Sequence, residues 1–392
     1  MLKKTIHLLK TNSVFTPVLF IIDLFLFLID LCAVCGIRTK KPDSLCIIKL
    51  DKLGDYILFR NFVIYLFSKD SNKNKQITLI LNEENKKFVE YLDGNLFTNI
   101  IWVNIYKYSS NPIYRYHKSK EIYKLGFETA VTPTYSRVLV LDDFITFVTR
   151  AKNRIGQTAH LINIKNWEKR FGDKLYTSII HVSHNIIFEF ERNRLFFQKL
   201  INADLSAIQL NINHLQNRSY SAIKYAVIMP GAADKFREWA AGNFSKVADY
   251  LIKEKGLQVV LCGSKSEAYT GEAIKKSAIY HENIQNKIGT LSIAELFETL
   301  NGAQFIVSNE TGAVHICAAM NKVVFCISNG NHFMKYTEYP EKLGKIVHYI
   351  YPSEIDDLIY NKKKIAERFD YKSDIDISTI VLERVIKCIS GK

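Results

Sequence analysis

The sequence predicts an α/β protein built from two Rossmann-like domains that face each other across a cleft. Short apolar runs alternate with helix-like stretches, the rhythm of a doubly wound parallel sheet, and this series occurs twice. A polar segment without periodicity, residues 202–221, separates the two series and predicts a linker. The chain of 392 residues, 48% of them apolar, is long enough for two separate cores. Such folds bind ligands at the carboxyl ends of their strands, so the cleft is the expected site.

In the first half of the chain, residues 44–50 form an apolar run typical of a buried parallel strand, and the turn at residues 51–55 follows it. Residues 57–67 carry apolar side chains on most faces and predict a helix. Further strand-like runs lie at residues 76–81, 100–103 and 129–132.

The second half repeats the pattern from residues 225–229, a strand that ends in Pro-Gly-Ala-Ala. The apolar spacing after Phe244 predicts a helix that ends at Gly256. Ser292 and Glu295 form a capping box at the start of another helix. The remaining expected elements are strands at residues 257–261, 304–307 and 323–327 and a C-terminal helix at residues 379–389.

Residues 1–41 form an apolar and basic segment before the first predicted strand. Within residues 18–35, sixteen of the eighteen side chains are apolar, and the two exceptions, Asp23 and Asp30, share one helical face. The apolar residues favour insertion into a bilayer by about 5 to 9 kcal/mol, and the two Asp oppose it by about 5 to 7 kcal/mol, so spanning is nearly balanced. We expect a helix in the interface of an anionic membrane, and a helix buried against the first domain is the alternative. The flanking basic residues are Lys3, Lys4, Lys10, Arg38, Lys40 and Lys41.

Net positive charge is concentrated in the first half. Residues 1–219 contain 31 Lys and Arg against 19 Asp and Glu, a net charge of +12, whereas residues 220–392 carry +2. This excess indicates a polyanionic partner, and because no nucleic-acid-binding signature accompanies it, we expect an anionic glycolipid or membrane surface.

The seven cysteines show neither zinc-ligand spacing nor a disulfide framework, which favours a reducing, cytoplasmic compartment.

The most informative motif occupies residues 308–319. A buried strand ends at Val307, a Gly-containing turn presents Glu310 and Thr311, and small residues then begin a helix. A carboxylate at such a junction binds the hydroxyls of a ribose or sugar, and the free amides of the helix start bind phosphate. Alone, the pattern favours an ordinary strand-turn-helix junction over a ligand site, and the surrounding motifs reverse this interpretation.

Five blocks in order along the chain resemble glycosyltransferase family 9, the lipopolysaccharide heptosyltransferase family. The last of them resembles the family signature Asp-Thr-Gly-x-x-His-x-Ala-Ala, and the first contains its Leu-Gly-Asp turn. The blocks are residues 47–55, 154–156, 230–239, 263–267 and 308–319. The resemblance implies the GT-B fold, with an acceptor-binding domain at residues 42–215, a nucleotide-sugar-binding domain at residues 222–375, and a C-terminal helix at residues 376–392 that packs on the body.

The resemblance implies an inverting glycosyltransferase that moves a sugar, heptose or another, from a nucleotide diphosphate to a lipopolysaccharide core or related glycolipid. Asp55, directly after a strand, is the expected base for the acceptor hydroxyl. An N-cap role for Asp55 is the alternative, and Asp51 is the second choice as base. Anionic acceptors are expected to meet Lys49, Asp51, Arg137 and Arg154, which are equally compatible with ordinary surface charge.

The second domain is implied to hold the donor. Arg237 resembles the family's cationic residue for the diphosphate, and a guanidinium pairs bidentately with phosphate. Glu267 and Glu310 are expected to accept hydrogen bonds from ribose, base or sugar, although Glu267 also suits the first turn of a helix. His315, on the helical face of Thr311, is expected to add charge at the leaving group, with a buried core histidine as the alternative. The full donor set is Gly231, Ala232, Ala233, Arg237, Glu267, Glu310, Thr311, Gly312 and His315.

Some positions depart from the family pattern. Glu310 stands where the family usually has Asp, and Ala232 and Ala233 stand where hydroxyl residues are usual, which we expect to reset the donor contacts. No metal ion or other cofactor is expected, because the one Asp-x-Asp motif, residues 374–376, lies among polar residues near the C-terminus.

Two other function classes remain open from the sequence. A catalytically silent sugar-nucleotide-binding protein at the membrane surface would keep Arg237, Glu310 and Thr311 but would need no carboxylate at position 55. An oxidoreductase is disfavoured because no Gly-x-Gly-x-x-Gly motif follows an early strand. The expected protein is therefore a membrane-associated transferase at the cytoplasmic face of the inner membrane.

Overall fold

The computed structural model of the chain describes residues 16–68, 76–97, 99–183, 187–212, 224–356, 358, 361–369 and 373–391. Lys3, Lys4 and Lys10, residues 213–221 of the predicted linker and the predicted boundaries at residues 215 and 222 lie outside them. The chain divides into two compact units. The first comprises the described residues within Met1–Lys52, Ile64–His184 and Phe196–Ala203, and the second comprises those within Leu53–Val63, Asn185–Leu195 and Asp204–Lys392.

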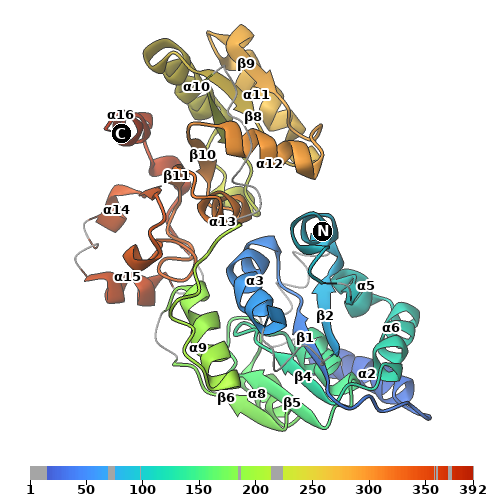
Figure 1. The fold of residues 1–392 in the computed structure, drawn as a ribbon. Coiled ribbons are helices and arrows are strands. Elements are labelled where there is room, and N and C mark those ends of the chain that lie inside the picture. Colours follow the sequence, from blue (N-terminus) through green and yellow to red (C-terminus); the bar gives the residue numbers. More distant parts are fainter. Residues whose placement is uncertain are drawn as a thin grey trace. The chain divides into compact units, whose positions relative to one another are not determined.

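The first unit is built on a six-stranded parallel sheet with the strand order β3-β2-β1-β4-β5-β6 (Figure 1). This is the strand order of a dinucleotide-binding Rossmann sheet. The central strand β1 is buried along nearly its whole length, because both faces of a parallel sheet are covered. The strands are β1 (Ser44–Lys49), β2 (Gln76–Asn82), β3 (Ile100–Val103), β4 (Thr129–Thr132), β5 (Asn153–Gln157) and β6 (Ser178–Ile180).

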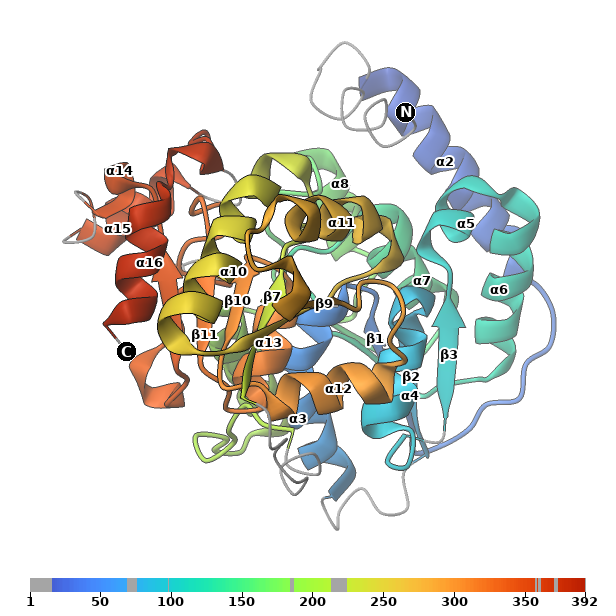
Figure 2. The same ribbon diagram turned by 90° about the horizontal axis from the view of Figure 1, so that it is seen from above.

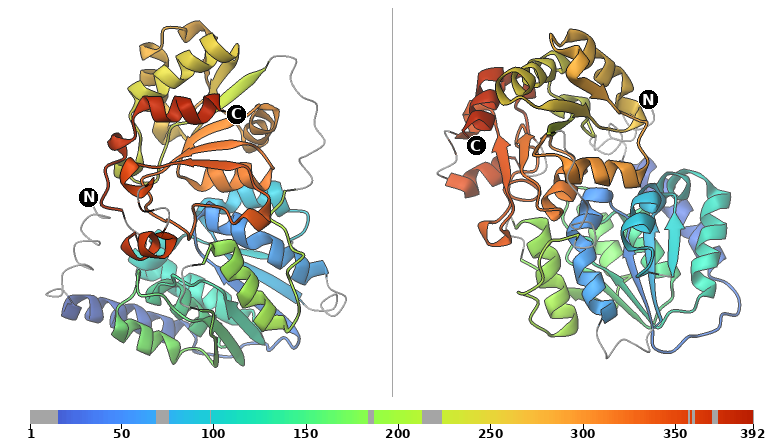
Figure 3. Two further views of the ribbon diagram at one scale, coloured as in Figure 1. Left: turned by 90° about the vertical axis from the view of Figure 1, so that its left-hand side faces the viewer. Right: turned by 45° about the horizontal axis from the view of Figure 1, so that its top comes forward.

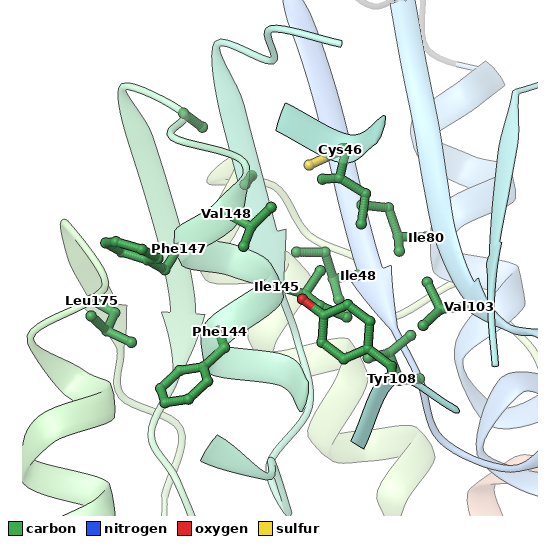
Figure 4. Close-up of a cluster of buried hydrophobic side chains, with 14 of the residues drawn as sticks. Cys46, Ile48, Ile80, Val103, Tyr108, Phe144, Ile145, Phe147, Val148 and Leu175 are labelled. Atoms are coloured by element: carbon green, nitrogen blue, oxygen red, sulfur yellow. The ribbon is translucent and has the colours of Figure 1, made fainter. Parts of the chain in front are cut away.

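Helices and apolar side chains form the core of the first unit. Figure 4 shows part of it, with Ile48, Ile80 and Val103 of the sheet beside Phe144 and Ile145 of α7. The helices are α2 (Thr16–Ala33), α4 (Lys86–Asp93), α5 (Ile105–Ser110), α6 (Pro112–Lys124), α7 (Phe144–Val148) and α8 (Asn166–Asp173), with a π-helical turn, η4 (Leu139–Asp143), before α7. Two further helices, α3 (Leu53–Ser68) and α9 (Glu189–Ile201), contribute residues to both units.

The predicted N-terminal helix is present as α2, which lies alongside α6 in the first unit (Figure 2). One face packs on the unit: Leu26 is buried, and the ring centroid of Phe27 lies 5.1 Å from that of Phe144. Asp30 is fully buried on the same side and forms an ion pair with Arg115. Among the described residues, no helix is both long enough and apolar enough to cross a membrane.

The second unit repeats the architecture of the first. Its parallel sheet has the order β12-β11-β10-β7-β8-β9, so that strands counted within the unit again follow 3-2-1-4-5-6. The strands are β7 (Tyr225–Met229), β8 (Gln258–Leu261), β9 (Ile284–Asn286), β10 (Ile306–Asn309), β11 (Val324–Ile327) and β12 (Val347–Ile350). The helices are α10 (Ala241–Lys255), α11 (Ala268–Ser277), α12 (Ile293–Gly302), α13 (Gly312–Ala319), α14 (Ser353–Asp356), α15 (Lys362–Arg368) and α16 (Leu382–Ser390), with the short 3-10 turns η6 (Lys235–Arg237) and η7 (Lys265–Glu267).

Local sequence signals set the helix ends of this unit. α10 ends at Gly256, whose φ of +63° is the left-handed conformation that glycine adopts without strain. The predicted capping box begins α12, since the Glu295 N–H donates to the Ser292 hydroxyl at 3.3 Å. The C-terminal α16, red in Figure 3, lies beside the yellow α10 and buries Val385 and Ile389 in the core.

Segments of α3 and α9 complete the second unit. The ring centroids of Phe62 and Phe190 lie 4.8 Å apart, and the Asn193 side chain donates to the Leu58 carbonyl at 3.3 Å. The first turn of α3, which carries Asp55, therefore belongs to the same compact unit as the predicted donor residues.

Candidate active site

The junction between β10 and α13 has the strand-turn-helix form that the sequence predicts. β10 is buried throughout, and Thr311 is the N-cap of α13, with its hydroxyl accepting from the Ala313 N–H at 3.3 Å. Glu310 precedes the cap and Gly312 begins the helix. The turn presents a carboxylate and helix-start amides at the carboxyl edge of the sheet, where Rossmann-like sheets bind ligands.

Glu310 is a buried carboxylate with three partners. Its Oε1 lies 2.8 Å from Nδ1 of His332 and 3.3 Å from Nη1 of Arg237, and the Ser328 hydroxyl donates to its Oε2. Nδ1 of His332 also lies 3.2 Å from Nη1 of Arg237. The contact of Nδ1 with the Glu310 carboxylate is shorter and involves a charged acceptor, so we assign the proton to Nδ1, which then donates to Glu310. Burial alone would raise the pKa of Glu310, but these partners outweigh burial and lower it to about 2. The carboxylate is therefore ionised and fixed in place.

Arg237 lies in η6 and its side chain is buried, with 6% of the residue exposed. Asn309, at the end of β10, holds the loop that carries it: the Asn309 side chain donates to the Pro230 carbonyl at 2.6 Å and accepts from the Trp239 N–H at 3.3 Å. Within the described part of the chain, Nε of Arg237 has no hydrogen-bond partner. This atom is itself buried, so the guanidinium carries one unsatisfied donor inside the site.

Asp55 lies in the first turn of α3 and accepts a hydrogen bond from the Tyr336 hydroxyl at 2.8 Å. The helix begins at Leu53, earlier than the sequence predicts, so Asp55 sits inside the first turn instead of at the N-cap. A carboxylate there still benefits from the positive end of the helix. The partly exposed side chain is held on one side by the tyrosine.

The first turns of α3 and α13 meet through two glycines. A Cβ added to Gly54 would lie 3.2 Å from Cα of Gly312 and 2.9 Å from Cδ2 of His315. Such a close approach is open only to residues without a side chain. The two helix starts, each with a partial positive charge, are thereby brought together in one unit.

His315 is a buried residue of α13, and its Nδ1 lies 2.6 Å from the Tyr339 hydroxyl. Burial lowers the pKa of His315 to about 4. The imidazole is therefore neutral near pH 7 and acts there as a hydrogen-bonding group, in contrast to the cationic role expected from the sequence. His315 is thus buried, as its alternative interpretation has it, and it lies beside the candidate site.

Residues 330–340 supply the partners that sequence reasoning missed. His332 contacts Glu310, Tyr336 contacts Asp55, and Tyr339 contacts His315. The Tyr336 N–H donates to the His332 carbonyl at 3.0 Å, which forms a turn and brings the spaced side chains to one side. A usable signal was present: polar and aromatic residues follow directly after the buried β11, at the edge where ligands bind.

The other predicted donor residues surround η7. Glu267 completes a capping box, with its carboxylate accepting from the Ser264 N–H at 2.8 Å, and burial raises its pKa. A Cβ on Gly231 would overlap this carboxylate, so the glycine accommodates Glu267 in the structure. Ala232 is half-buried and Ala233 is exposed in the same loop. Glu267 thus has the helix-start role that was its alternative interpretation, while remaining next to the loop after β7.

Two of the predicted acceptor residues form a buried cluster in the first unit. Lys49 is 2% exposed and pairs with Asp51 at 2.8 Å, and Asp51 also accepts from the Thr134 hydroxyl at 3.0 Å. Asp142 lies nearby, and burial together with the charge of Asp51 raises its pKa to about 8. Lys49 is therefore an internal partner of Asp51, and the surface charge that was its alternative interpretation does not apply.

Arg137 and Arg154 are also used inside the first unit. Arg137 is fully buried and pairs with Asp143 at 3.0 Å and with Asp173. Arg154 donates to two backbone carbonyls at 2.6 and 2.7 Å. Both side chains therefore have partners inside the unit, and their contact with an acceptor stays a prediction. Within the described ranges, no group of three or more His, Cys, Asp and Glu side chains is arranged to hold a metal ion.

Comparison with known proteins identifies the family. The model of glycosyltransferase family 9 (heptosyltransferase) matches residues 145–341, half of the chain, including the Arg237, Glu310 and His315 positions described above. The chain belongs to glycosyltransferase family 9. A relative of this family-9 chain, lipooligosaccharide heptosyltransferase 2 of Haemophilus ducreyi, is 32% identical over 88 residues, which cover 22% of this chain. That match spans only 25% of the length of the relative.

Solved structures share the fold of the family-9 chain along most of its length. E. coli heptosyltransferase WaaC, solved with ADP and with ADP-2-deoxy-2-fluoro heptose, gives TM-scores of 0.63 and 0.64 at 15% and 14% identity. The match covers 89% of this chain and 99% of WaaC. A family 9 glycosyltransferase from Veillonella parvula gives a TM-score of 0.65 at 16% identity, covering 92% of this chain and 98% of that one. The two Rossmann-like domains are thus those of the GT-B fold, as the sequence predicts.

Proposed function

We propose that this chain is an inverting glycosyltransferase in which Asp55 is the general base and Arg237 binds the donor diphosphate. The observation that carries the proposal is a continuous set of contacts within the second unit. Asp55 accepts from Tyr336, the Tyr336 ring lies 5.4 Å from that of His332, and His332 contacts the Glu310 carboxylate that pairs with Arg237. A base and an anion-binding cation are therefore supported by one network.

The chemistry follows from these roles. The acceptor hydroxyl oxygen forms a bond to the anomeric carbon as Asp55 takes its proton, and the bond from that carbon to the diphosphate oxygen breaks. The nucleoside diphosphate leaves with the bonding electron pair and needs positive charge around it. In this proposal Arg237 offers the positive charge of its guanidinium, and the first turn of α13 offers amides. We propose that these groups, and no metal ion or other cofactor, neutralise the leaving group, so EDTA should leave transfer unchanged.

The proposed donor is a nucleotide diphosphate sugar, with ADP-heptose the first candidate because a fold relative was solved with ADP and with an ADP-heptose analogue. The proposed acceptor is a lipopolysaccharide core or related glycolipid, as the name of the matching relative suggests. We further propose that the basic first domain takes this anionic acceptor, and that the enzyme works at the cytoplasmic face of the membrane.

The test compares three variants of the full chain. Asp55→Asn should lower transfer to a deacylated core acceptor by about a hundredfold to ten-thousandfold, the usual contribution of a general base, while the donor-induced thermal shift persists. Asp51→Asn tests the second choice as base, and Glu383→Gln on the exposed face of α16 is the matched control. Transfer is measured by mass spectrometry of the acceptor.

The outcomes separate the candidate functions. Loss of transfer in the Asp55 variant alone supports the proposal. If Asp51→Asn abolishes transfer and Asp55→Asn does not, the base is misassigned. Donor binding by all variants without transfer by any of them, across a panel of acceptors, would favour the silent sugar-nucleotide-binding protein.

A further inference from the structure

The outer face of α2 is an unusually apolar surface. Ile21, Phe25 and Leu28 are 63%, 53% and 50% exposed, and Phe20 and Leu24 are exposed to a similar extent. Soluble monomers rarely expose so many large apolar side chains together, and such patches mark interaction sites. The surface continues onto α6, where Ile113 is 71% exposed, through an apolar groove of about 500 Å³ that Phe25, Leu28 and Ile113 help to line.

The inner face of α2 is held firmly by the first unit. Asp30 and Arg115 are both fully buried, and their carboxylate and guanidinium make two contacts, at 2.5 and 3.0 Å. The same carboxylate accepts from the Ser119 hydroxyl at 2.8 Å and from the Tyr108 hydroxyl at 3.3 Å. Withdrawal of α2 would leave a buried arginine without its counter-charge, which is strongly unfavourable. The apolar face is therefore a constant part of the surface of this unit.

Basic side chains gather where α2 ends. Arg38 donates to the carbonyls of Thr149 and Arg150 at 2.5 Å each, and the exposed Arg150 guanidinium lies 4.1 Å from the centroid of the Phe147 ring. Lys120 donates to the Tyr116 hydroxyl at 2.9 Å, and Tyr116 lines the groove together with Cys32 in the last turns of α2. An apolar face bordered by cations is the pattern of helices that lie on anionic bilayers.

We propose that α2, with the adjoining end of α6, is a monotopic membrane-docking surface whose partner is an anionic lipid bilayer. The helix lies along the bilayer, its outer side chains enter the acyl region, and Lys120 and Arg150 meet the headgroups. The cations that border this face favour an anionic bilayer as its occupant, and a second copy of the chain is tested below as the alternative. The inference rests on the proposed function in one respect: a transferase that acts on a glycolipid needs to reach its acceptor at a bilayer.

The test is flotation of the full chain with vesicles of phosphatidylcholine alone or mixed with phosphatidylglycerol. The double variant Phe25→Gln with Leu28→Gln should lose about tenfold or more of its binding to the mixed vesicles. The matched control carries Ile279→Gln and Val381→Gln, which are 77% and 56% exposed in the second unit, and should bind as the unaltered chain does. Binding of the unaltered chain should weaken at high salt and on phosphatidylcholine alone, because the cations need anionic headgroups.

Each outcome bears on the proposal. Undiminished flotation of the Phe25 and Leu28 variant overturns it. A dimer in light scattering that these two substitutions dissolve would make the occupant a second copy and also overturns it. If the variant fails to fold, the unaltered chain still provides a test. Binding of the unaltered chain that depends neither on salt nor on the content of phosphatidylglycerol would contradict the proposal. Transfer to a deacylated, soluble acceptor is measured in parallel, so vesicle binding without transfer would reject the proposed function and leave the docking surface standing.

Discussion

The Tyr336 hydroxyl donates a 2.8 Å hydrogen bond to the carboxylate of Asp55, although 281 positions separate the two residues along the chain. The tyrosine is part of a loop after β11, whereas the aspartate is in the first turn of α3. The contact lies within the second compact unit, so it belongs to the same body as Arg237 and Glu310. Asp55 is thereby oriented by the loop that also orients the donor-side carboxylate.

Tyr336→Phe should reduce kcat for transfer by about tenfold. The substitution removes one hydrogen bond to an ionised group, which contributes about 1.5–3 kcal/mol, and leaves the ring in place. The donor KM should change little, because the phenol contacts the base and not Arg237. The exposed Tyr269, 87% exposed on α11, gives the control Tyr269→Phe. Equal kcat values for the two variants would remove Tyr336 from the role of a positioning residue.

Glu310→Gln should destabilise the protein near neutral pH and much less in acid. Folding lowers the pKa of this carboxyl from 4.5 to about 2, despite burial, through His332, Arg237 and Ser328. A depressed pKa means that the unfolded chain binds the proton more tightly, so the stabilisation is complete above pH 4.5 and is lost as the pH falls towards 2. The full effect is about 3 kcal/mol in the free energy of unfolding.

Urea unfolding of the unaltered chain and the Gln variant at several pH values checks this. The difference in unfolding free energy should be constant from pH 7 to pH 5 and should narrow below pH 4.5. A difference that stays unchanged into the acid range would show that the ionised carboxylate is not what stabilises this part of the fold.

Much of the fold could be predicted because its strands are buried on both faces. β1, β2 and β4 coincide closely with apolar runs in the sequence, since a central parallel strand is covered by helices above and below, and the edge strand β3 is apolar as well. β5 was missed because its residues, Asn-Arg-Ile-Gly-Gln, carry little apolar signal and pair with β4 through the backbone. A strand of this kind is specified by its neighbours.

The candidate site was predictable only in part, for a similar reason. Glu310 and Thr311 could be placed at a helix start from local sequence alone, because a cap depends on neighbouring residues. The pairing of His332, Tyr336 and Tyr339 with their partners depends on how a distant loop folds back, and the polar and aromatic residues after β11 indicate only that this loop lies at the ligand-binding edge. The predicted acceptor residues Lys49 and Arg137 show the same limit. The sequence shows that they are cationic, whereas only the fold shows that each forms an ion pair with a carboxylate inside the first unit.

Gly54→Ala should lower both stability and transfer. The added Cβ would lie 2.9 Å from Cδ2 of the buried His315 and 3.2 Å from Cα of Gly312, and the backbone atom cannot move away cheaply. Overpacking of this kind costs about 1–3 kcal/mol and would push the first turn of α3, with Asp55, out of place. Thermal unfolding and initial rates of transfer measure the two effects.

Gly242→Ala is the matched control. Gly242 lies in the first turn of α10, and a Cβ built on it meets nothing within 4 Å. Alanine there should be neutral or stabilise by about 0.5–1 kcal/mol, because it reduces the freedom of the unfolded chain. If both variants behaved alike, the glycine contact between α3 and α13 would not be a constraint on the site.

Asp30→Ala should destabilise the first unit by about 3–5 kcal/mol, because it leaves the fully buried Arg115 guanidinium without its carboxylate. Replacing both partners, in Asp30→Leu with Arg115→Met, should recover much of this loss, since a well-packed apolar pair carries no desolvation cost. Burial raises the pKa of Asp30, and the hydrogen bonds and charge of its partners Arg115, Ser119 and Tyr108 counteract part of this rise. The ionised form of Asp30 therefore depends on these partners. Urea unfolding of Asp30→Leu, Arg115→Met and their double variant gives the coupling free energy. A double variant no more stable than Asp30→Ala would mean that Asp30 acts through Ser119 and Tyr108 instead of through the ion pair.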